Sequence, residues 1–186
     1  GTASMGRINR ILEDEPDIRD NHRTNHNIKK IRGEIEFQNV GFAYNEKQFV
    51  LRHINLKIRA GMTLAIIGHT GSGKSSLLNA LLQEMGTMQG RVGMKGSVAY
   101  VAQQAWIFNA TIKNNILFGL PPNHSKYLET VDKCCLLPDF DSFGEARDQT
   151  EIGEKGINLS GGQKQRISVA RAVYADADIY LFDDPL

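Results

Sequence analysis

Eight residues, from Gly68 to Ser75, constrain the fold of this chain more than any other segment. They read Gly-His-Thr-Gly-Ser-Gly-Lys-Ser and fit the pattern G-x-x-x-x-G-K-[ST]. The apolar run 63–67 before them predicts a strand buried on both faces, and the leucine-rich segment 76–84 after them predicts a helix. A glycine-rich turn between a strand and a helix gathers backbone N–H groups around one anion. We therefore predict a phosphate-binding loop.

The residue types of this loop suit the chemistry of a bound nucleotide. Glycines let the backbone turn sharply, so that successive N–H groups point into one hollow. Lys74 supplies a positive charge for the β- and γ-phosphates, and Ser75 offers its hydroxyl to Mg²⁺. The predicted nucleotide-binding residues of this segment are Gly68, Thr70, Gly71, Ser72, Gly73, Lys74, Ser75 and Ser76.

A pair of acidic residues follows a second apolar run late in the sequence. Residues 179–182 predict another buried strand, and Asp183 and Asp184 come directly after it. In a nucleotide site the first carboxylate holds Mg²⁺, usually through water, and the second polarises the attacking water. We predict these two roles for Asp183 and Asp184, respectively.

Strand-like and helix-like segments alternate along the chain. Strands are predicted at 35–40, 50–58 and 97–102, a loop at 42–45, and helical segments at 111–150 and 163–174. This alternation indicates an α/β fold with a parallel sheet. Ahead of these elements, apolar residues at helical spacing in 5–15 predict a short helix that Pro16 ends, followed by a linker. The same segment also fits the tail of a helix that enters from an upstream domain.

Charge and composition exclude several classes of protein. The 22 basic and 21 acidic residues leave a net charge of +1, which gives no field for binding nucleic acid through its phosphates. The longest apolar runs, such as 64–67, fall far short of the about 20 residues that a membrane-spanning helix needs. We interpret the adjacent Cys134 and Cys135 as packing residues of a helix, and His22 and His26 lack partners for a metal site.

The segment Leu159-Ser160-Gly161-Gly162-Gln163 narrows the nucleotide-binding classes sharply, because it resembles the signature of ATP-binding-cassette (ABC) ATPases. The order of aromatic loop, phosphate loop, glutamine loop, helical segment, signature and acidic strand is also that family's, and the resemblance covers residues 34–186. It implies a P-loop NTPase with a mostly parallel sheet, an N-terminal antiparallel β portion and a helical lobe inserted at about 105–160. It also implies that residues 1–33 are a linker or helix from an upstream membrane domain.

The resemblance implies roles for further residues. Tyr44 matches the aromatic residue that stacks on adenine, and Gln103 matches the glutamine that touches Mg²⁺ or water and senses the transport domain. The residues Ser160, Gly161, Gly162 and Gln163 match the groups that contact the γ-phosphate of ATP held by an opposite domain. The implied active unit is a head-to-tail pair of such domains with ATP in the interface, attached to transmembrane domains. The implied catalytic residues are Asp184, Gln103 and Lys74, and the implied Mg²⁺ ligands are Ser75, Gln103 and Asp183.

The back half of the chain resembles the first nucleotide-binding domain of multidrug-resistance-associated (ABCC) exporters, in the segments 96–106, 115–119, 150–171 and 178–186. Asp184 belongs to this resemblance, since that domain typically has Asp where most ABC ATPases have Glu. The shorter side chain lies about 1.3–1.5 Å further from the water, and a misplacement of about 1 Å costs about 10²-fold in rate, so we expect slow hydrolysis here. The front half resembles half-size exporters more closely, in the segments 5–18, 33–44 and 50–67. A chimeric origin of the gene therefore stays an open alternative.

The sequence therefore predicts an ATP-binding domain that drives export, held at the cytosolic face of a membrane through transmembrane domains outside this sequence. The reaction is ATP and water to ADP and phosphate, without nucleic acid as a partner. The family continues past the acidic strand with an Asp-bearing loop, a strand and a switch histidine, so we expect residues 1–186 alone to be inactive. Two alternatives stay open: an ATP-binding regulatory domain of an ABCC-type channel with little turnover, and a soluble ABC protein acting on DNA or ribosomes.

Overall fold

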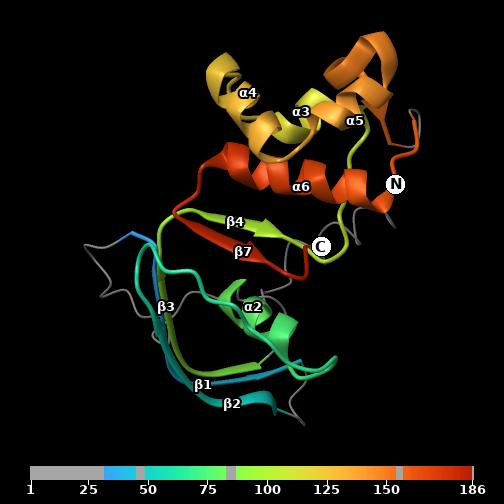
Figure 1. Cartoon of the computed structure of the whole chain (residues 1–186). Helices are drawn as coiled ribbons and strands as arrows, with labels where there is room; N and C mark the ends of the chain where they lie inside the picture. Colours follow the sequence, from blue (N-terminus) through green and yellow to red (C-terminus); the bar gives the residue numbers. More distant parts are fainter. Residues whose placement is uncertain (1–31, 45–48, 83–86, 154–156, 186) are drawn as a thin grey trace, which may run out of the picture. The chain divides into compact units, whose positions relative to one another are not determined.

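The computed structural model describes residues 32–44, 49–82, 87–153 and 157–185. It divides into two compact units, Gly1–Lys95 and Gly96–Leu186 (Figure 1), and each unit is described by itself. The helix predicted at 5–15 and the two histidines His22 and His26 lie outside the described residues.

The first unit contains an antiparallel sheet of three strands. They are β1 (Glu34–Ala43), β2 (Phe49–Ile58) and β3 (Thr87–Lys95), in the order β2-β1-β3. The predictions of strands at 35–40 and 50–58 are confirmed. The loop predicted to start at Phe42 is wrong, because Phe42 and Ala43 still pair with both neighbouring strands and are fully buried.

Strand β3 was not predicted, because glycines interrupt its alternation of apolar and polar residues. One of them, Gly90, has φ +79°, and a Cβ there would lie 2.3 Å from the carbonyl oxygen of Asn39. The close approach occurs where the β1–β3 register shifts, between Gln38 and Gly41. A glycine is therefore required at this irregularity, although it weakens the strand signal in the sequence.

The predicted helix after the phosphate-loop motif is confirmed as α2 (Lys74–Leu82). Its buried residues include Leu78, Ala80 and Leu81, and the helix contacts all three strands of the sheet (Figure 1). This packing fixes the helix that starts at Lys74 against the antiparallel sheet.

The strand predicted at 63–67 is wrong. The described part of the chain holds no strand that pairs with these residues, and their backbone is assigned to neither strand nor helix. Leu64, Ile66 and Ile67 are exposed, Ile67 by 93% of its surface. An apolar run predicts a buried strand only when neighbouring strands satisfy its backbone groups and cover its faces, and periodicity alone carries no information about such neighbours.

The second unit contains a parallel pair of strands, β4 (Val98–Val101) and β7 (Ile179–Phe182). Val98 lies opposite Ile179 and Val101 lies opposite Phe182. The strand prediction at 97–102 is confirmed, but β7 is buried on one face only, since Tyr180 and Phe182 are exposed. Their rings stack 6.3 Å apart on the uncovered face.

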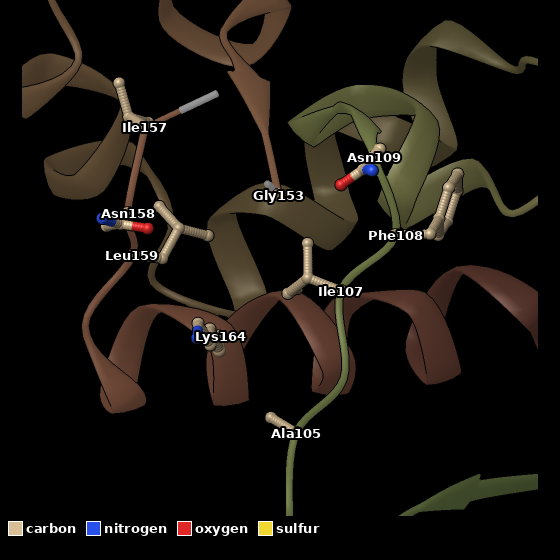
Figure 2. A pocket seen from close by; sticks show the side chains of 9 residues that line it. All are labelled: Ala105, Ile107, Phe108, Asn109, Gly153, Ile157, Asn158, Leu159 and Lys164. Atoms are coloured by element: carbon tan, nitrogen blue, oxygen red, sulfur yellow. The ribbon is translucent and has the colours of Figure 1, made fainter. Parts of the chain in front are cut away.

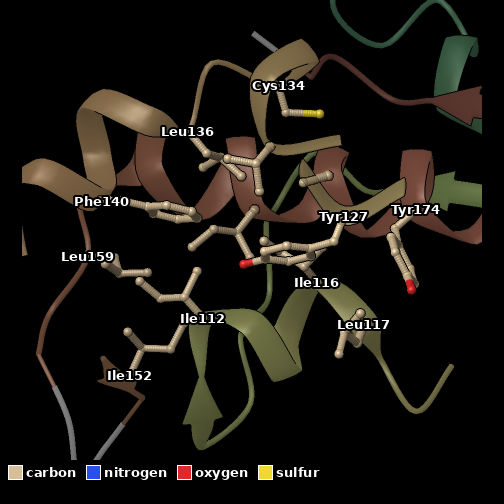
Figure 3. Close-up of a cluster of buried hydrophobic side chains, with 13 residues drawn as sticks. Ile112, Ile116, Leu117, Tyr127, Cys134, Leu136, Phe140, Ile152, Leu159 and Tyr174 are labelled. Atoms are coloured by element: carbon tan, nitrogen blue, oxygen red, sulfur yellow. The ribbon is translucent and has the colours of Figure 1, made fainter. Parts of the chain in front are cut away.

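The helices of the second unit enclose an apolar core (Figure 3). They are α3 (Ile112–Leu117), α4 (His124–Lys133), α5 (Leu137–Ser142), the 3-10 helix η1 (Gly144–Gln149) and α6 (Gly161–Ala175). The predictions of helical structure at 111–150 and of a helix at 163–174 are confirmed, with a short antiparallel pair, β5 (Ala110–Thr111) and β6 (Glu151–Ile152), beside them. Helix α6 contacts α3 and α4 and also β4, so it links the helices to the strand pair (Figure 1).

The two cysteines separate at the end of α4. Cys134 is buried in the helical core (Figure 3), which confirms its prediction as a packing residue. Cys135 has φ +54° and is exposed, so the prediction is wrong for this residue. The chain turns between them toward Leu136, which is fully buried.

Candidate functional site

The phosphate-loop motif forms a tight turn ahead of α2. Within it the N–H of Ser72 donates to the carbonyl oxygen of His69 at 3.1 Å. Gly71 and Gly73 have φ values of +79° and +93°, a region that side chains with a Cβ rarely adopt. A Cβ on Gly73 would also lie 3.1 Å from Cδ2 of Leu51. The motif therefore needs glycine at position 73 for both backbone conformation and space.

Lys74, the first residue of α2, folds back over this turn. Its ammonium group donates to the carbonyl oxygens of Gly68 and His69, each at 2.9 Å. The N–H of Leu77 donates to the carbonyl oxygen of Gly73 at 3.0 Å, which begins the helical hydrogen bonding. A full positive charge is thus held at a helix N-terminus, where the helix dipole also favours an anion.

Tyr44 follows β1 and reaches the same helix. Its hydroxyl lies 3.0 Å from Oγ of Ser76 and accepts a hydrogen bond from Nδ2 of Asn79 at 3.0 Å. Its ring meets Phe42 edge to face at 5.1 Å between centroids and is 51% exposed. Within the first unit, the structure therefore brings the predicted aromatic residue to the start of the helix that follows the phosphate loop.

Gln103 and Asp184 lie at the carboxyl ends of the parallel strands β4 and β7. Nε2 of Gln103 donates to Oδ2 of Asp184 at 3.4 Å, although 81 residues separate them. Between them, the N–H of Asp183 donates to the carbonyl oxygen of Val101 at 3.0 Å and continues the ladder. Parallel strands place their carboxyl ends at one edge, which is where α/β sheets position ligand-binding side chains.

Asp184 adopts an uncommon backbone conformation. Its φ is +47°, two residues after the last residue of β7. Aspartate tolerates this left-handed region better than most residues with a Cβ. The turn carries the carboxylate of Asp184 toward Gln103 rather than continuing the strand.

The signature segment forms the N-terminus of α6. Ser160 is the N-cap, its Oγ accepts from the N–H of Gln163 at 3.2 Å, and Oε1 of Gln163 accepts from the N–H of Ser160 at 2.9 Å. This reciprocal pair is a capping box. Gly161 and Gly162 form the exposed first turn, so their backbone N–H groups lie at the positive end of a 15-residue helix.

An ion pair, which the sequence did not reveal, holds this N-terminus. Nε and Nη2 of Arg166 on α6 donate to the two carboxylate oxygens of Asp139 on α5 at 2.7 and 2.8 Å. Nε2 of Gln163 lies 3.4 Å from the same carboxylate. Asp139 is buried, and its hydrogen bonds raise the pKa of Arg166. The two partners are 27 residues apart, so no local pattern could have shown the pair.

A second basic residue of α6, Arg171, lies among aromatic rings. Its guanidinium lies 3.9 Å from the ring centroid of Trp106 and donates to the carbonyl oxygen of Asn115 at 2.8 Å. Burial lowers its pKa to about 10, so the group stays charged at neutral pH. The sequence held a signal for this role, because Ile167 and Tyr174, four residues before and three after, lie on the buried face of the helix.

A cavity of about 540 Å³ lies beside α6 in the second unit (Figure 2). Polar atoms form the larger part of its described walls, and Lys164 is the charged residue among the lining side chains. The lining residues are Ala105, Ile107, Phe108, Asn109, Gly153, Ile157, Asn158, Leu159 and Lys164. None of the predicted site residues belongs to this described lining, although Leu159 opens the signature segment and Lys164 directly follows it.

The donor chemistry of the predicted Mg²⁺ ligands suits a hard cation. A serine hydroxyl, a glutamine amide and an aspartate carboxylate offer oxygen atoms, which Mg²⁺ prefers. In the described part of the chain, no group of three or more His, Cys, Asp and Glu side chains could hold a metal ion by itself. None of the described helices has the length and apolar character required to cross a membrane.

Residues 51–186 match the protein family described as ABC transporter. ABC transporter C family member 8 of Dictyostelium discoideum is 48% identical over 185 residues, which cover 100% of this chain and 11% of that protein. ATP-binding cassette sub-family C member 3 of Rattus norvegicus is 57% identical over 136 residues, 73% of this chain and 9% of the relative. ATP-binding cassette sub-family C member 2 of Homo sapiens is 52% identical over 153 residues, 82% of this chain and 10% of the relative.

The chain thus spans about a tenth of the length of these curated relatives. The relative from Dictyostelium aligns with the whole chain, including the front half whose segments read more like half-size exporters. The front half is therefore also similar to a C-family member.

Proposed function

Because residues 51–186 match the ABC transporter family and the whole chain aligns with C-family relatives, this chain belongs to that family as an ATP-binding domain of the ABCC type, and we propose that it drives export across a membrane. The observation that carries the proposal is the phosphate-loop turn, whose Lys74 ammonium is held at the start of α2. A cation and a helix N-terminus at one turn favour a polyanion such as the triphosphate of ATP.

The proposed contacts with ATP come from three segments of the chain. Residues 68–76 bind the phosphates, and Tyr44 stacks on the adenine. Ser160, Gly161, Gly162 and Gln163 contact the γ-phosphate of ATP held by a second nucleotide-binding domain, in a head-to-tail dimer. The exposed, capped start of α6 supports this role, because its first-turn N–H groups are oriented before any ligand arrives.

For hydrolysis, we propose that the carboxylate of Asp184 orients the attacking water and accepts its proton, with Gln103 positioning both groups. Bound Mg²⁺ would neutralise charge on the phosphate oxygens, and Ser75, Gln103 and Asp183 are the residues that would hold it. Lys74 stabilises the charge of the γ-phosphate. Because Asp184 is one methylene shorter than glutamate, its site hydrolyses ATP slowly, and the signature of this chain completes a faster site on the partner domain.

The proposed architecture extends beyond the residues described above. In the proposed complete domain, the sheet is mostly parallel beside the N-terminal antiparallel β portion, and the helices between about residues 105 and 160 form an inserted lobe. Residues 1–33 are proposed as a linker or helix from an upstream membrane domain. Closure of the ATP-bound dimer moves transmembrane domains, which hold this chain at the cytosolic face of the membrane. The net charge of +1 supports a role without nucleic acid.

Replacement of Lys74 tests the proposed ATP binding directly. Lys74→Ala removes the cation at the start of α2, and we expect it to abolish Mg-ATP binding to this chain, measured by isothermal titration calorimetry. Lys133→Ala is the matched control, because the Lys133 ammonium pairs only with Glu129 on the exposed face of α4 among the contacts described. Unchanged affinity in Lys74→Ala would show that the loop is not the phosphate site.

Asp184 also supports a second function, an ATP-binding regulatory domain with little turnover. Two variants, assayed in the full-length assembled protein, separate the functions. Asp184→Glu restores the missing methylene and is expected to raise hydrolysis at this site by up to about 10²-fold. ATP turnover that appears on pairing with a partner domain and disappears in Ser160→Arg favours the exporter. Tight Mg-ATP binding without turnover, both before and after pairing, favours the regulatory domain.

A further inference from the structure

We propose that Asn79 is a positioning residue for the adenine base, acting through the hydroxyl of Tyr44. Asn79 lies on α2, outside the phosphate-loop motif, and its Nδ2 donates to the Tyr44 hydroxyl at 3.0 Å. The inference rests on the proposed stacking of Tyr44 on adenine. It makes the base and phosphate sites depend on one helix.

The anchor is built from two neighbouring positions on one face of α2. Ser76 and Asn79 are three residues apart, which places their side chains next to each other on the helix. Both reach the same tyrosine oxygen, Ser76 through Oγ at 3.0 Å and Asn79 through Nδ2 at 3.0 Å. Ser76 is only 6% exposed, so this contact is made at the buried side of the helix.

The Tyr44 ring needs such an anchor. Half of its surface is exposed, and the described ring contact is the edge of Phe42. An aromatic ring held at one edge can swing about its Cα–Cβ bond between rotamers. The two hydrogen bonds at the far end of the ring fix its tip to α2, so the face that stacks on a base keeps one orientation.

The donor inventory fixes the direction of the Asn79 bond and permits the direction in which the tyrosine donates to Ser76. Asn79 donates through its amide to the tyrosine oxygen, which leaves the tyrosine proton free to be donated to Oγ of Ser76. Ser76 then keeps its own proton for an acceptor elsewhere. A phosphate oxygen is such an acceptor, because Ser76 directly follows the Lys74-Ser75 pair of the motif.

Anchoring should therefore matter for ligands with a base and not for the bare phosphate chain. A ring that is already oriented loses less conformational freedom when adenine stacks on it. We measure dissociation constants of Mg-ATP and of Mg-tripolyphosphate for this chain by calorimetry. Asn79→Ala is expected to weaken the binding of Mg-ATP by about two- to tenfold and to leave the binding of Mg-tripolyphosphate unchanged. Asn114→Ala, at an exposed asparagine of α3, is the matched control and should change neither value.

A second variant tests whether the tyrosine hydroxyl transmits the effect. Tyr44→Phe keeps the ring and removes both hydrogen bonds of its hydroxyl, so its loss of affinity for ATP should equal or exceed that of Asn79→Ala, again without effect on tripolyphosphate. The double variant should lose no more affinity than Tyr44→Phe, since that change already removes the bond to Asn79. Additive losses, or equal losses for ATP and tripolyphosphate, would overturn the inference.

Tyr44→Ala distinguishes failure of this inference from failure of the proposed function. It removes the stacking ring and should weaken ATP binding more than Asn79→Ala or Tyr44→Phe does, again without effect on tripolyphosphate binding. If Tyr44→Ala has this selective effect while Asn79→Ala has none, only the anchoring is overturned. If Tyr44→Ala leaves ATP binding unchanged, the stacking role is overturned together with the anchoring.

Discussion

Helices α2 and α6 both begin at a predicted phosphate contact, but their N-termini are built differently. At α6, side chains of the protein complete the first turn through the Ser160–Gln163 capping box. At α2, the preceding loop residues 68–72 are exposed, and the Lys74 ammonium donates to backbone carbonyl oxygens of that loop. The start of α6 is therefore fixed by its own side chains, whereas the start of α2 depends on the backbone conformations of glycines in the preceding loop.

The difference extends to the surroundings of each helix. Helix α6 is tied to α5 by the Asp139–Arg166 ion pair and to the segment before α3 by Arg171. Helix α2 packs on the antiparallel sheet, while the apolar residues 63–67 just before its loop are exposed. The start of α6 is thus held by side-chain contacts within its unit, whereas the residues just before the α2 loop lie exposed in the described structure.

The largest expected effect comes from Arg171, which fixes the middle of α6. Arg171→Ala removes a half-buried guanidinium that stacks on Trp106 and donates to the carbonyl oxygen of Asn115. We expect the free energy of unfolding of the second unit to fall by about 3 kcal/mol. Urea unfolding followed by far-ultraviolet circular dichroism measures the change.

The matched control is Arg147→Ala. Arg147 pairs with Asp141 at the surface of the same unit, where ion pairs contribute below about 1 kcal/mol. Equal losses of unfolding free energy in the two variants would mean that Arg171 stabilises the second unit no more than an exposed arginine does.

The second expected effect concerns the ion pair at the start of α6. Asp139→Ala removes both acceptors of the Arg166 guanidinium, and we expect a loss of about 2 kcal/mol. This expected loss of unfolding free energy is smaller than that for a fully buried ion pair, because the Arg166 side chain is 41% exposed. Urea unfolding is followed here by the fluorescence of Trp106, the single tryptophan. Asp141→Ala, at an exposed partner of Arg147, should change the midpoint little, and a loss as large as that of Asp139→Ala would contradict the assigned role.

Elements with a strong local pattern were predictable from the sequence. The helices α2 and α6 follow glycine-containing motifs and carry periodic apolar residues, and β1, β2 and β4 alternate or form short apolar runs. Asp184 was predicted from the acidic pair after an apolar run, and Tyr44 and Gln103 came from family resemblance. The structure adds contacts that no pattern carries. The tie between Tyr44 and Asn79 spans 35 residues.

The failures have a common physical cause, which is dependence on distant partners. Residues 63–67 look like a central strand, but strand formation requires neighbours that the local pattern does not specify. The glycines of strand β3 weaken its sequence pattern, and Gly90 is needed where the β1–β3 register shifts, close to Asn39. Asp139 looks like an ordinary surface acid near the start of a short helix, and only the fold brings it to Arg166.

Replacing one glycine at each helix start tests the comparison directly. Gly73→Ala adds a Cβ at φ +93° and 3.1 Å from Leu51, so we expect about tenfold weaker Mg-ATP binding to this chain. Gly161→Ala is the matched change in the first turn of α6, where an added Cβ meets nothing within 4 Å. It should leave ATP affinity unchanged and raise stability slightly through helix propensity. Equal effects at both positions would contradict the difference between the two helix starts.

The smallest expected effect belongs to the cap of α6. Ser160→Ala removes the oxygen that accepts from the N–H of Gln163, and we expect a loss of about 1 kcal/mol in the free energy of unfolding. Ser160→Asp keeps a side-chain acceptor at the cap and should retain the wild-type stability, measured by the same urea unfolding. In the assembled protein, however, a carboxylate at this position repels the γ-phosphate, so Ser160→Asp should lose turnover at the partner's site while the cap stays intact. Normal turnover in Ser160→Asp would mean that the cap, and not contact with phosphate, is the whole role of this serine.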